Sequence, residues 1–307
     1  MAVSRAQRLS SFFARFGQKP ALSLPLPQKI ARMLFDLNAR IIYKTPHDLT
    51  VERADLGGVP GAWVGRQGQS KEGVMLYLHG GAFVLGSHRS YRHLVAIIAA
   101  EAGMAGYLPE YRLAPEHRFP AALEDAMSVY GGLLEDGFEP DEIVFVGDSA
   151  GGGLILSLLH LLGVEEMPMP RAVALMSPVA DLTLSSPSIH ENKRADPLIS
   201  HAWAARGVRD YLGGHDATDP QVSGIFGQFD GVPPVLFQVG ETEILRDDTL
   251  RMAEVLRAQG VDVTVKVWKD VPHVWHLMAG RVPEADQGIA ELAAFLRAQA
   301  PERSELR

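Results

Sequence analysis

Residues 147–151 read Gly-Asp-Ser-Ala-Gly and stand directly between a short apolar run and an apolar helical pattern. The run at 143–146 is typical of a buried strand, and residues 150–162 predict a helix. A strand that turns sharply into a helix strains the serine backbone and lifts its hydroxyl above the edge of the sheet. Glycine on either side leaves room for that turn. We therefore predict that Ser149 is a nucleophile; the alternative is an ordinary tight turn with a capping serine.

The rest of the chain supplies the sheet that such a turn requires. Short apolar segments predict strands at 49–56, 59–66, 74–78, 105–108, 143–146, 172–176, 235–239 and 261–268. Helical patterns are found at 91–100, 121–134, 150–162, 247–259 and 284–299. Because strands alternate with helices, we predict a mainly parallel sheet covered on both faces.

Two regions depart from this alternation and predict a helical cap. Residues 4–16 and 28–43 have helical patterns separated by Pro20, Pro25 and Pro27, and a helix near 201–211 lies in a stretch without a strong strand. In the second pattern, apolar residues recur at Ile30, Leu34, Leu37 and Ile41. We divide the chain into N-terminal cap helices (1–46), a first part of the catalytic domain (47–181), a cap insertion (182–222) and a second part of the catalytic domain (223–307).

The composition excludes several classes of protein. The chain has 307 residues, of which 47% are hydrophobic and 21% charged, as in ordinary globular proteins. The net charge of −8 comes without a dense Lys/Arg stripe, which argues against nucleic-acid binding. Cysteine is absent, so a disulfide, a thiolate metal site and a cysteine nucleophile are all excluded.

The first residues do not resemble a targeting segment. Arg15 interrupts the apolar run around Phe12 and Phe13, and no segment reaches transmembrane length without charge. We expect a soluble, cytoplasmic protein that binds no membrane. Phe12, Phe13 and Phe16 are expected to form a helix face packed on the body of the protein, with a membrane anchor as the alternative.

A serine nucleophile needs a base and an orienting acid. Where the serine stands on a strand-to-helix turn of this kind, the acid follows it along the chain, and the histidine comes after the acid. His273 lies on a loop just after the last predicted strand, where the base is expected. His276 could reach the same region, and the pair could instead bind a metal, although no third ligand with recognisable spacing accompanies it.

The acid is expected on the loop that follows the preceding strand, at residues 240–248. Four carboxylates compete there: Glu241, Glu243, Asp247 and Asp248. The two aspartates open a predicted helix, where they would serve as helix-capping groups. Spacing alone does not separate Glu241 from Glu243.

A second glycine-rich segment follows the strand at 74–78. Residues 79–87 read His-Gly-Gly-Ala-Phe-Val-Leu-Gly-Ser. The N–H groups of Gly80 and Gly81, joined by that of Ala150, are predicted to hold a tetrahedral oxyanion. A phosphate-binding loop is the alternative, but no Gly-Lys-Ser/Thr follows. His79 is expected to brace the loop.

These motifs together resemble the hormone-sensitive-lipase-like family, the bacterial family IV esterases, in the branch with Asp before the serine. The resemblance also includes residues 111–117, Tyr-Arg-Leu-Ala-Pro-Glu-His, and 119–122, Phe-Pro-Ala-Ala, and it covers most of the chain after about residue 72. It implies an α/β-hydrolase fold with a mostly parallel eight-stranded sheet flanked by helices and a helical cap. It also implies hydrolysis of short-to-medium acyl esters.

The resemblance selects Glu243 as the acid, because the family pattern of acid, any residue, Leu, any residue, Asp aligns with residues 243–247. The family usually has Asp at the first position, and Asp247 is our second choice. Two other positions depart from the pattern. Residues 274–275 are Val-Trp where the family usually has Gly-Phe, which we expect to narrow the pocket, and Ala82 replaces a frequent third glycine.

The sequence thus predicts a serine carboxylic-ester hydrolase that acts through Ser149, His273 and Glu243 and forms an acyl-enzyme. We expect no cofactor and no metal, a small-molecule ester as substrate and, from the family, a possible homodimer through the edge strand near 261–268. A lactonase or amidase with the same machinery is an alternative. A non-catalytic small-molecule receptor, such as the plant gibberellin receptors that lack the catalytic histidine, is another.

Overall fold

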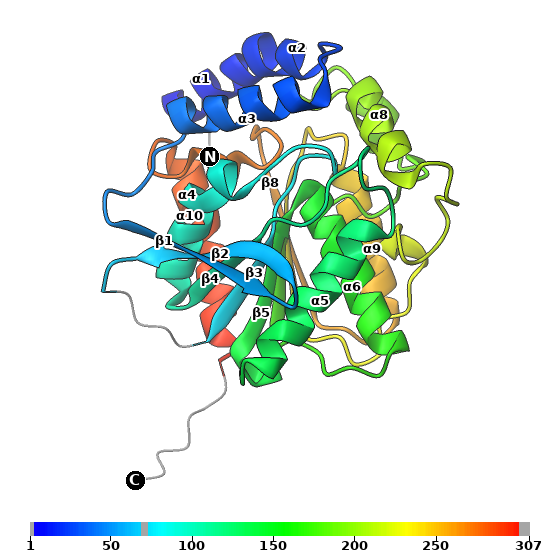
Figure 1. Cartoon of the computed structure of the whole chain (residues 1–307). Helices are drawn as coiled ribbons and strands as arrows, with labels where there is room; N and C mark the ends of the chain where they lie inside the picture. The colour runs from blue at the N-terminus through cyan, green and yellow to red at the C-terminus, as the bar shows by residue number, and fades with distance from the viewer. Residues whose placement is uncertain (1–2, 69–72, 301–307) are drawn as a thin grey trace.

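The computed structural model describes residues 3–68 and 73–300; the remaining parts of the predicted domains, at 1–2, 69–72 and 301–307, lie outside the described residues. A single twisted sheet runs through the centre of the molecule (Figure 1). Its strands are β1 (Leu49–Leu56), β2 (Val59–Arg66), β3 (Val74–Leu78), β4 (Ala105–Pro109), β5 (Ile143–Asp148), β6 (Ala172–Met176), β7 (Val235–Gly240) and β8 (Val263–Trp268).

The strand order is β1-β2-β4-β3-β5-β6-β7-β8. β2 pairs antiparallel with both β1 and β4, and every other pair is parallel. The predicted eight-stranded, mostly parallel sheet is therefore confirmed. Parallel strands place their carboxyl ends at one edge of the sheet, so the loops after β3, β5, β6, β7 and β8 meet there.

Helices cover both faces of the sheet (Figure 1). One face carries α4 (His88–Ala102) and α10 (Pro283–Ala298), and the other carries α5 (Ala121–Glu135), α6 (Ser149–Val164) and α9 (Arg246–Ala258). Shorter elements are η2 (Pro140–Glu142), α7 (Ser188–Glu191), η3 (Gly224–Phe226) and η4 (Trp275–Met278). Every residue of β3 to β7 is buried, which explains why these strands are apolar throughout rather than alternating.

The chain begins with α1 (Arg5–Phe13), η1 (Ala14–Gln18), α2 (Lys19–Leu22) and α3 (Gln28–Ile42). The predicted break at Pro20 is wrong, because the helical backbone continues from α1 through η1 into α2, and Pro20 lies in the first turn of α2. The helix ends two residues later, and Pro25 and Pro27 follow in the connection to α3.

Helix α8 (His201–Leu212) lies beside these N-terminal helices at the same end of the molecule (Figure 1). Arg206 of α8 donates a hydrogen bond to the Leu22 carbonyl at 3.0 Å. Arg15 and Lys19 donate to backbone carbonyls at 194–196. These contacts join the two predicted parts of the cap, while the division into domains stays a prediction.

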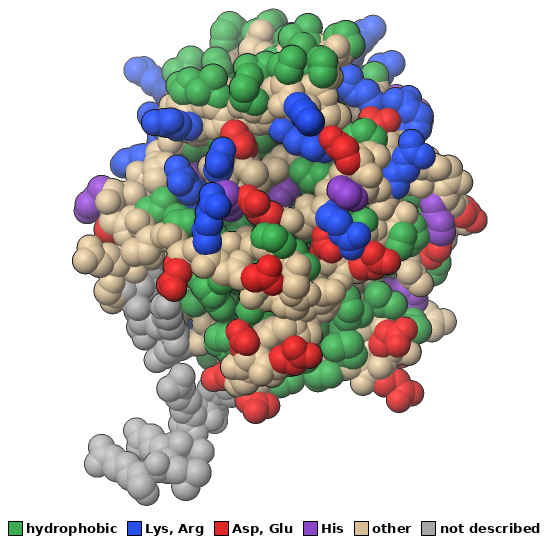
Figure 2. Space-filling view, in the orientation of Figure 1, with side chains coloured by type: hydrophobic (Ala, Val, Ile, Leu, Met, Phe, Trp, Pro, Cys, Tyr) green, Lys and Arg blue, Asp and Glu red, His purple; other side chains and the backbone are tan. Residues whose placement is uncertain are grey.

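The prediction that Phe12, Phe13 and Phe16 pack on the body is wrong. Their exposed fractions are 60%, 48% and 64%. Figure 2 shows hydrophobic side chains gathered over this end of the molecule. Periodicity predicts an apolar face but not the direction in which it points, and here the face is turned outward. None of the helices in the described part of the chain is both long and apolar enough to span a bilayer.

Candidate active site

Ser149 stands at the sharp turn that the sequence predicts between β5 and α6. Its φ of 51° is a left-handed conformation that residues other than glycine rarely adopt and that costs about 1–3 kcal/mol. A Cβ added at Gly151 would lie 2.0 Å from the Leu78 carbonyl oxygen, so glycine there lets α6 approach β3. The serine is only 8% exposed and lies at the amino end of a helix, which favours negative charge nearby.

Asp148 ties this turn to the glycine-rich loop that follows β3. The buried carboxylate accepts hydrogen bonds from the Tyr77 hydroxyl at 2.7 Å, the Gly80 N–H at 2.9 Å and the Tyr91 hydroxyl at 3.1 Å. Burial raises the pKa of Asp148 to about 6, because desolvation outweighs these hydrogen bonds. From the sequence, Asp148 has no role beyond marking a family branch; its position next to Ser149, at the end of a buried strand, is the signal that was available.

The hydrogen bond from Gly80 corrects one of the predicted oxyanion donors. Its N–H is held by Asp148 and is not free to bind an oxyanion. The next two residues, Gly81 and Ala82, have φ values of 122° and 53°, and no described group accepts a hydrogen bond from their N–H groups. Ala82 and Ala150 line a small cavity together with Ser149. The structure therefore leaves Gly81, Ala82 and Ala150 as the available donors beside the serine.

His79 braces the same loop, in agreement with the role expected from the sequence. Its Nδ1–H donates to the Gly80 carbonyl at 2.8 Å, and its ring stacks between those of Tyr91 and Tyr111. The Tyr111 hydroxyl donates to the His79 carbonyl at 2.6 Å. Burial lowers the pKa of His79 to about 4, so the ring is neutral at physiological pH. Through Tyr111, the segment at 111–117 therefore supports the glycine-rich loop that follows β3.

Glu243 and His273, which come from different loops, meet at the carboxyl end of the sheet. His273 Nδ1–H donates to Glu243 Oε2 at 2.6 Å, and the glutamate is fully buried. Its other oxygen accepts from the Ser177 hydroxyl at 2.8 Å and from the Gly240 N–H at 2.6 Å. Both carboxylate oxygens are therefore engaged, which fixes the direction from which Glu243 approaches the imidazole. Ser177 was missed from the sequence; its signal is a polar residue directly after a buried strand.

The competing carboxylates of the same loop are placed elsewhere. Asp247 accepts from the Ser188 N–H at 2.9 Å and from Arg246 at 2.7 Å. Asp248 accepts from two backbone N–H groups, at 180 and 181. Glu241 is exposed. Only Glu243, among these four, contacts His273 through a hydrogen bond.

The electrostatic environment favours the charged form of His273. Burial by itself lowers the pKa of this imidazole, but the charge of Glu243, the hydrogen bond to it, and the charges of Asp196 and Asp148 outweigh burial and raise the pKa above 6.5. An imidazole of this kind accepts a proton more readily than a free one.

Asp196 is a second buried carboxylate near this pair and was not singled out from the sequence. It accepts hydrogen bonds from the Ile244 N–H at 2.9 Å and from the Leu198 and Ile199 N–H groups at 2.8 Å. One side chain therefore holds both the loop that carries Glu243 and the segment that leads into α8. The Asp-Pro dipeptide at 196–197, which favours a turn, was the available signal.

Val274, next to His273, has φ 49° and ψ 49°. A β-branched residue in this left-handed conformation is an outlier, which explains why the resembling family favours glycine at the position. Val274 N–H donates to the Ser177 hydroxyl at 3.4 Å, and the side chain lines the large cavity described below. The expected narrowing of the pocket stays a prediction.

His276 points to a different environment from His273. Its Nε2–H donates to the Gln238 side-chain oxygen at 2.8 Å, and burial lowers the pKa of His276 to about 3. It lines neither of the cavities at Ser149. In residues 3–68 and 73–300, no cluster of three or more His, Asp or Glu side chains is arranged to hold a metal ion.

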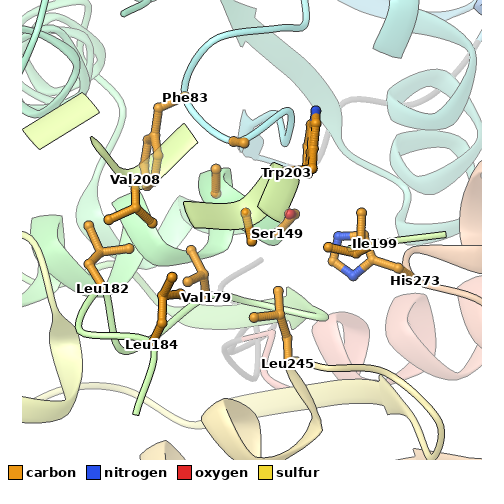
Figure 3. Close-up of a pocket in the computed structure, with 13 residues that line it drawn as sticks. Phe83, Ser149, Val179, Leu182, Leu184, Ile199, Trp203, Val208, Leu245 and His273 are labelled. Atoms are coloured by element: carbon orange, nitrogen blue, oxygen red, sulfur yellow. The ribbon is translucent and has the colours of Figure 1, made fainter. Parts of the chain in front are cut away.

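Two cavities of different size meet at Ser149 and His273, which line both. The smaller, of about 30 Å³, is enclosed by apolar side chains of the core and of α8; the larger, of about 500 Å³, extends beneath the N-terminal helices. Figure 3 shows the Ser149 hydroxyl directed toward the His273 ring, with Trp203 and Ile199 nearby. No hydrogen bond joins Ser149 and His273 in the described part of the chain, as is common before a substrate binds.

Comparison with known proteins agrees with this geometry. The model of a protein family described as having the alpha/beta hydrolase fold matches residues 75–277. An acetyl-hydrolase from Streptomyces hygroscopicus is 38% identical over 242 residues, which cover 79% of this chain and 81% of that protein. An esterase from Acinetobacter venetianus is 35% identical over 273 residues, covering 89% of each chain.

Solved structures extend the similarity to nearly the whole chain. The crystal structure of an esterase from the bacterial hormone-sensitive lipase family superposes with a TM-score of 0.92 at 35% sequence identity. The superposition covers 98% of this chain and 100% of the other. The N-terminal helices are thus part of the shared architecture.

Proposed function

Because the chain belongs to the hormone-sensitive-lipase-like esterases of the α/β-hydrolase fold and is a carboxylic-ester hydrolase, we propose that Ser149, His273 and Glu243 carry out the hydrolysis through an acyl-enzyme. The observation that carries this proposal is the fixed Glu243–His273 hydrogen bond beside a strained, cavity-facing serine. A serine hydroxyl becomes a useful nucleophile only beside a base oriented in this way.

In the first step, His273 Nε2 accepts the hydroxyl proton while Ser149 Oγ attacks the ester carbonyl carbon. Glu243 holds the Nδ1–H and stabilises the imidazolium that forms. The carbonyl oxygen becomes an oxyanion, which the N–H groups of Gly81, Ala82 and Ala150 stabilise. Collapse of this intermediate breaks the bond to the alkoxide, and His273 gives the proton to that leaving group.

In the second step, water attacks the acyl-enzyme carbonyl and passes a proton to His273. The second tetrahedral intermediate uses the same oxyanion donors. Its collapse returns the proton to Ser149 and releases the carboxylic acid. Every proton is transferred through a group that the site already contains.

The two unequal cavities support a substrate with one short and one longer group. We place the short group of the ester in the cavity of about 30 Å³ and the longer group in that of about 500 Å³. The relative named acetyl-hydrolase agrees with a short acyl group. Short-to-medium acyl esters are therefore the substrates that we propose.

An organophosphonate and a series of p-nitrophenyl esters test the proposal. The organophosphonate should label Ser149, which peptide mass spectrometry would identify. In the ester series, kcat/KM should fall as the acyl chain becomes long. Ser149→Ala should lower kcat on the order of 10⁶-fold, the loss known for serine hydrolases of another fold. Retention of full activity in this variant would overturn the assignment of the nucleophile.

A further inference from the structure

The outer surface of the N-terminal helices has an unusual concentration of apolar side chains. Fourteen large apolar side chains are exposed in the described part of the chain, and ten of them lie between residues 9 and 41. We call these ten the cap patch: Leu9, Phe12, Phe13, Phe16, Leu24, Ile30, Met33, Leu34, Leu37 and Ile41. Contiguous exposed apolar patches mark interaction sites with proteins, membranes or ligands.

Polar contacts on the opposite side of α3 fix the outward direction of the part of the patch that this helix carries. Arg32 donates to the carbonyls of Val84 and Ala114, both at 2.8 Å, and Asp36 accepts from the Ser87 hydroxyl at 2.7 Å. These two residues lie four apart and share the inner face of the helix. The apolar stripe on the other face is exposed because of how α3 is anchored.

The charge of this region is opposite to that of the rest of the chain. Residues 1–46 contain eight Lys or Arg residues and one acid, Asp36, whereas residues 47–307 contain 21 basic and 36 acidic residues. Figure 2 shows Lys and Arg flanking the hydrophobic end, with Asp and Glu mostly lower on the same face. Six basic residues of this region are exposed and form no ion pair with described residues: Arg5, Arg8, Arg15, Lys29, Arg40 and Lys44.

The cap patch is continuous with the large cavity at the candidate active site. Five members of the patch also line that cavity: Phe13, Leu24, Leu34, Leu37 and Ile41. Ser149 and His273 line the same cavity at its inner end. An apolar chain that enters between the N-terminal helices therefore has apolar side chains around it until it reaches the serine.

We propose that the cap patch docks on an anionic lipid surface. Its phenylalanines would insert among the acyl chains while the surrounding Lys and Arg contact the headgroup phosphates, as in interfacial amphipathic helices. The acidic remainder of the protein is repelled by the same surface, so the molecule would bind with the cap first. This replaces the expectation that the protein binds no membrane. Delivery of esters to Ser149 from that surface rests on the proposed function; docking itself does not.

A second copy of the chain fits the patch less well than a lipid surface. A two-fold dimer would place the patch against itself, because the same surface of both subunits forms such an interface. The basic residues of residues 1–46 would then face one another with little acidic charge to offset them. An anionic surface matches both the apolar side chains and the charge.

Vesicle sedimentation tests the docking without measuring catalysis. The protein should bind vesicles that contain phosphatidylglycerol and bind vesicles of phosphatidylcholine alone much more weakly, and salt should weaken the binding. Each basic residue near an anionic surface contributes roughly fivefold to binding, so Arg8→Gln combined with Arg40→Gln should weaken it by roughly 25-fold. Phe12→Ser combined with Phe16→Ser should weaken binding on both kinds of vesicle.

Matched controls are Lys269→Gln and Phe226→Ser, which change exposed residues outside the cap patch and should leave binding unchanged. Equal binding to both kinds of vesicle, or equal losses in patch and control variants, would overturn the proposal. The proposal would also be overturned if the wild type did not bind vesicles and sedimentation velocity showed it to be a dimer, with the double phenylalanine variant a monomer.

All variants should keep their circular dichroism and their hydrolysis of soluble p-nitrophenyl acetate. Absence of hydrolysis in every variant and in the wild type would count against the proposed function and leave the docking result standing.

Discussion

The loops around Ser149 and the helices α1 to α3 differ in almost every physical property, although both border the large cavity. In the loops, buried carboxylates such as Glu243 and Asp148 have each oxygen engaged by a hydrogen bond. On the outer face of the helices, apolar side chains such as Phe12 and Met33 are more than half exposed. The difference indicates that the proposed proton transfer requires side chains in fixed positions, whereas a surface for an apolar group requires only apolar side chains.

The substitution with the largest expected effect tests whether Glu243 or Asp247 orients His273. Glu243→Ala should lower kcat on the order of 10⁴-fold, because the imidazole loses its orienting partner. Asp247→Ala is the matched control, since the hydrogen bonds of the Asp247 carboxylate with described residues go to Ser188 and Arg246 and not to His273. Its kcat should stay near the wild-type value while stability falls by about 1 kcal/mol. Steady-state kinetics on p-nitrophenyl acetate would separate the two, and the reverse result would make Asp247 the acid.

Two leucine truncations compare how much the buried core and the N-terminal helices contribute to the free energy of unfolding. Leu154→Ala, in the buried part of α6, should lower the free energy of unfolding by about 2–5 kcal/mol, because it leaves a cavity in the core. Leu37→Ala on α3 should change it by no more than about 0.5 kcal/mol. Urea denaturation measures both values. Similar losses in the two variants would mean that the helices contribute to the core as much as α6 does.

Asp148→Ala tests whether the glycine-rich loop depends on the carboxylate behind it. Without the hydrogen bond to the Gly80 N–H the loop is free to shift, and a misplacement of about 1 Å can cost about 10²-fold in rate. We expect kcat to fall by that amount with little change in KM. Asp148→Asn keeps an oxygen for the same N–H and should recover part of the loss; equal kcat in both variants would count against this role.

The smallest expected effect concerns pH. His273 must be neutral to accept a proton, and its pKa is raised, so kcat/KM should increase with pH through a midpoint above 6.5. Glu243→Gln removes the largest charge that raises this pKa and should move the midpoint to lower pH. Asp196→Asn should move it in the same direction by less. A midpoint that neither substitution changes would show that another group controls the profile.

Local patterns were sufficient to predict the sheet and the turn at Ser149, because strand periodicity and the flanking glycines are properties of short segments. The proximity of Glu243 to His273 followed from the family pattern and not from spacing, which left Glu241 open. The role of Gly80 could not be predicted, since its N–H is taken by a carboxylate 68 residues away. The exposure of Phe12 was also missed, because a helical period identifies an apolar face but does not show whether that face packs against the protein or is exposed to solvent.

The left-handed backbone at Ser149 has a consequence for how this position evolves. Glycine adopts that conformation without strain, so Ser149→Gly should make the protein about 1 kcal/mol more stable while removing the proposed nucleophile. Mutation followed by selection for folding alone would therefore favour losing the hydroxyl. Folding stability alone therefore does not account for a serine at this position.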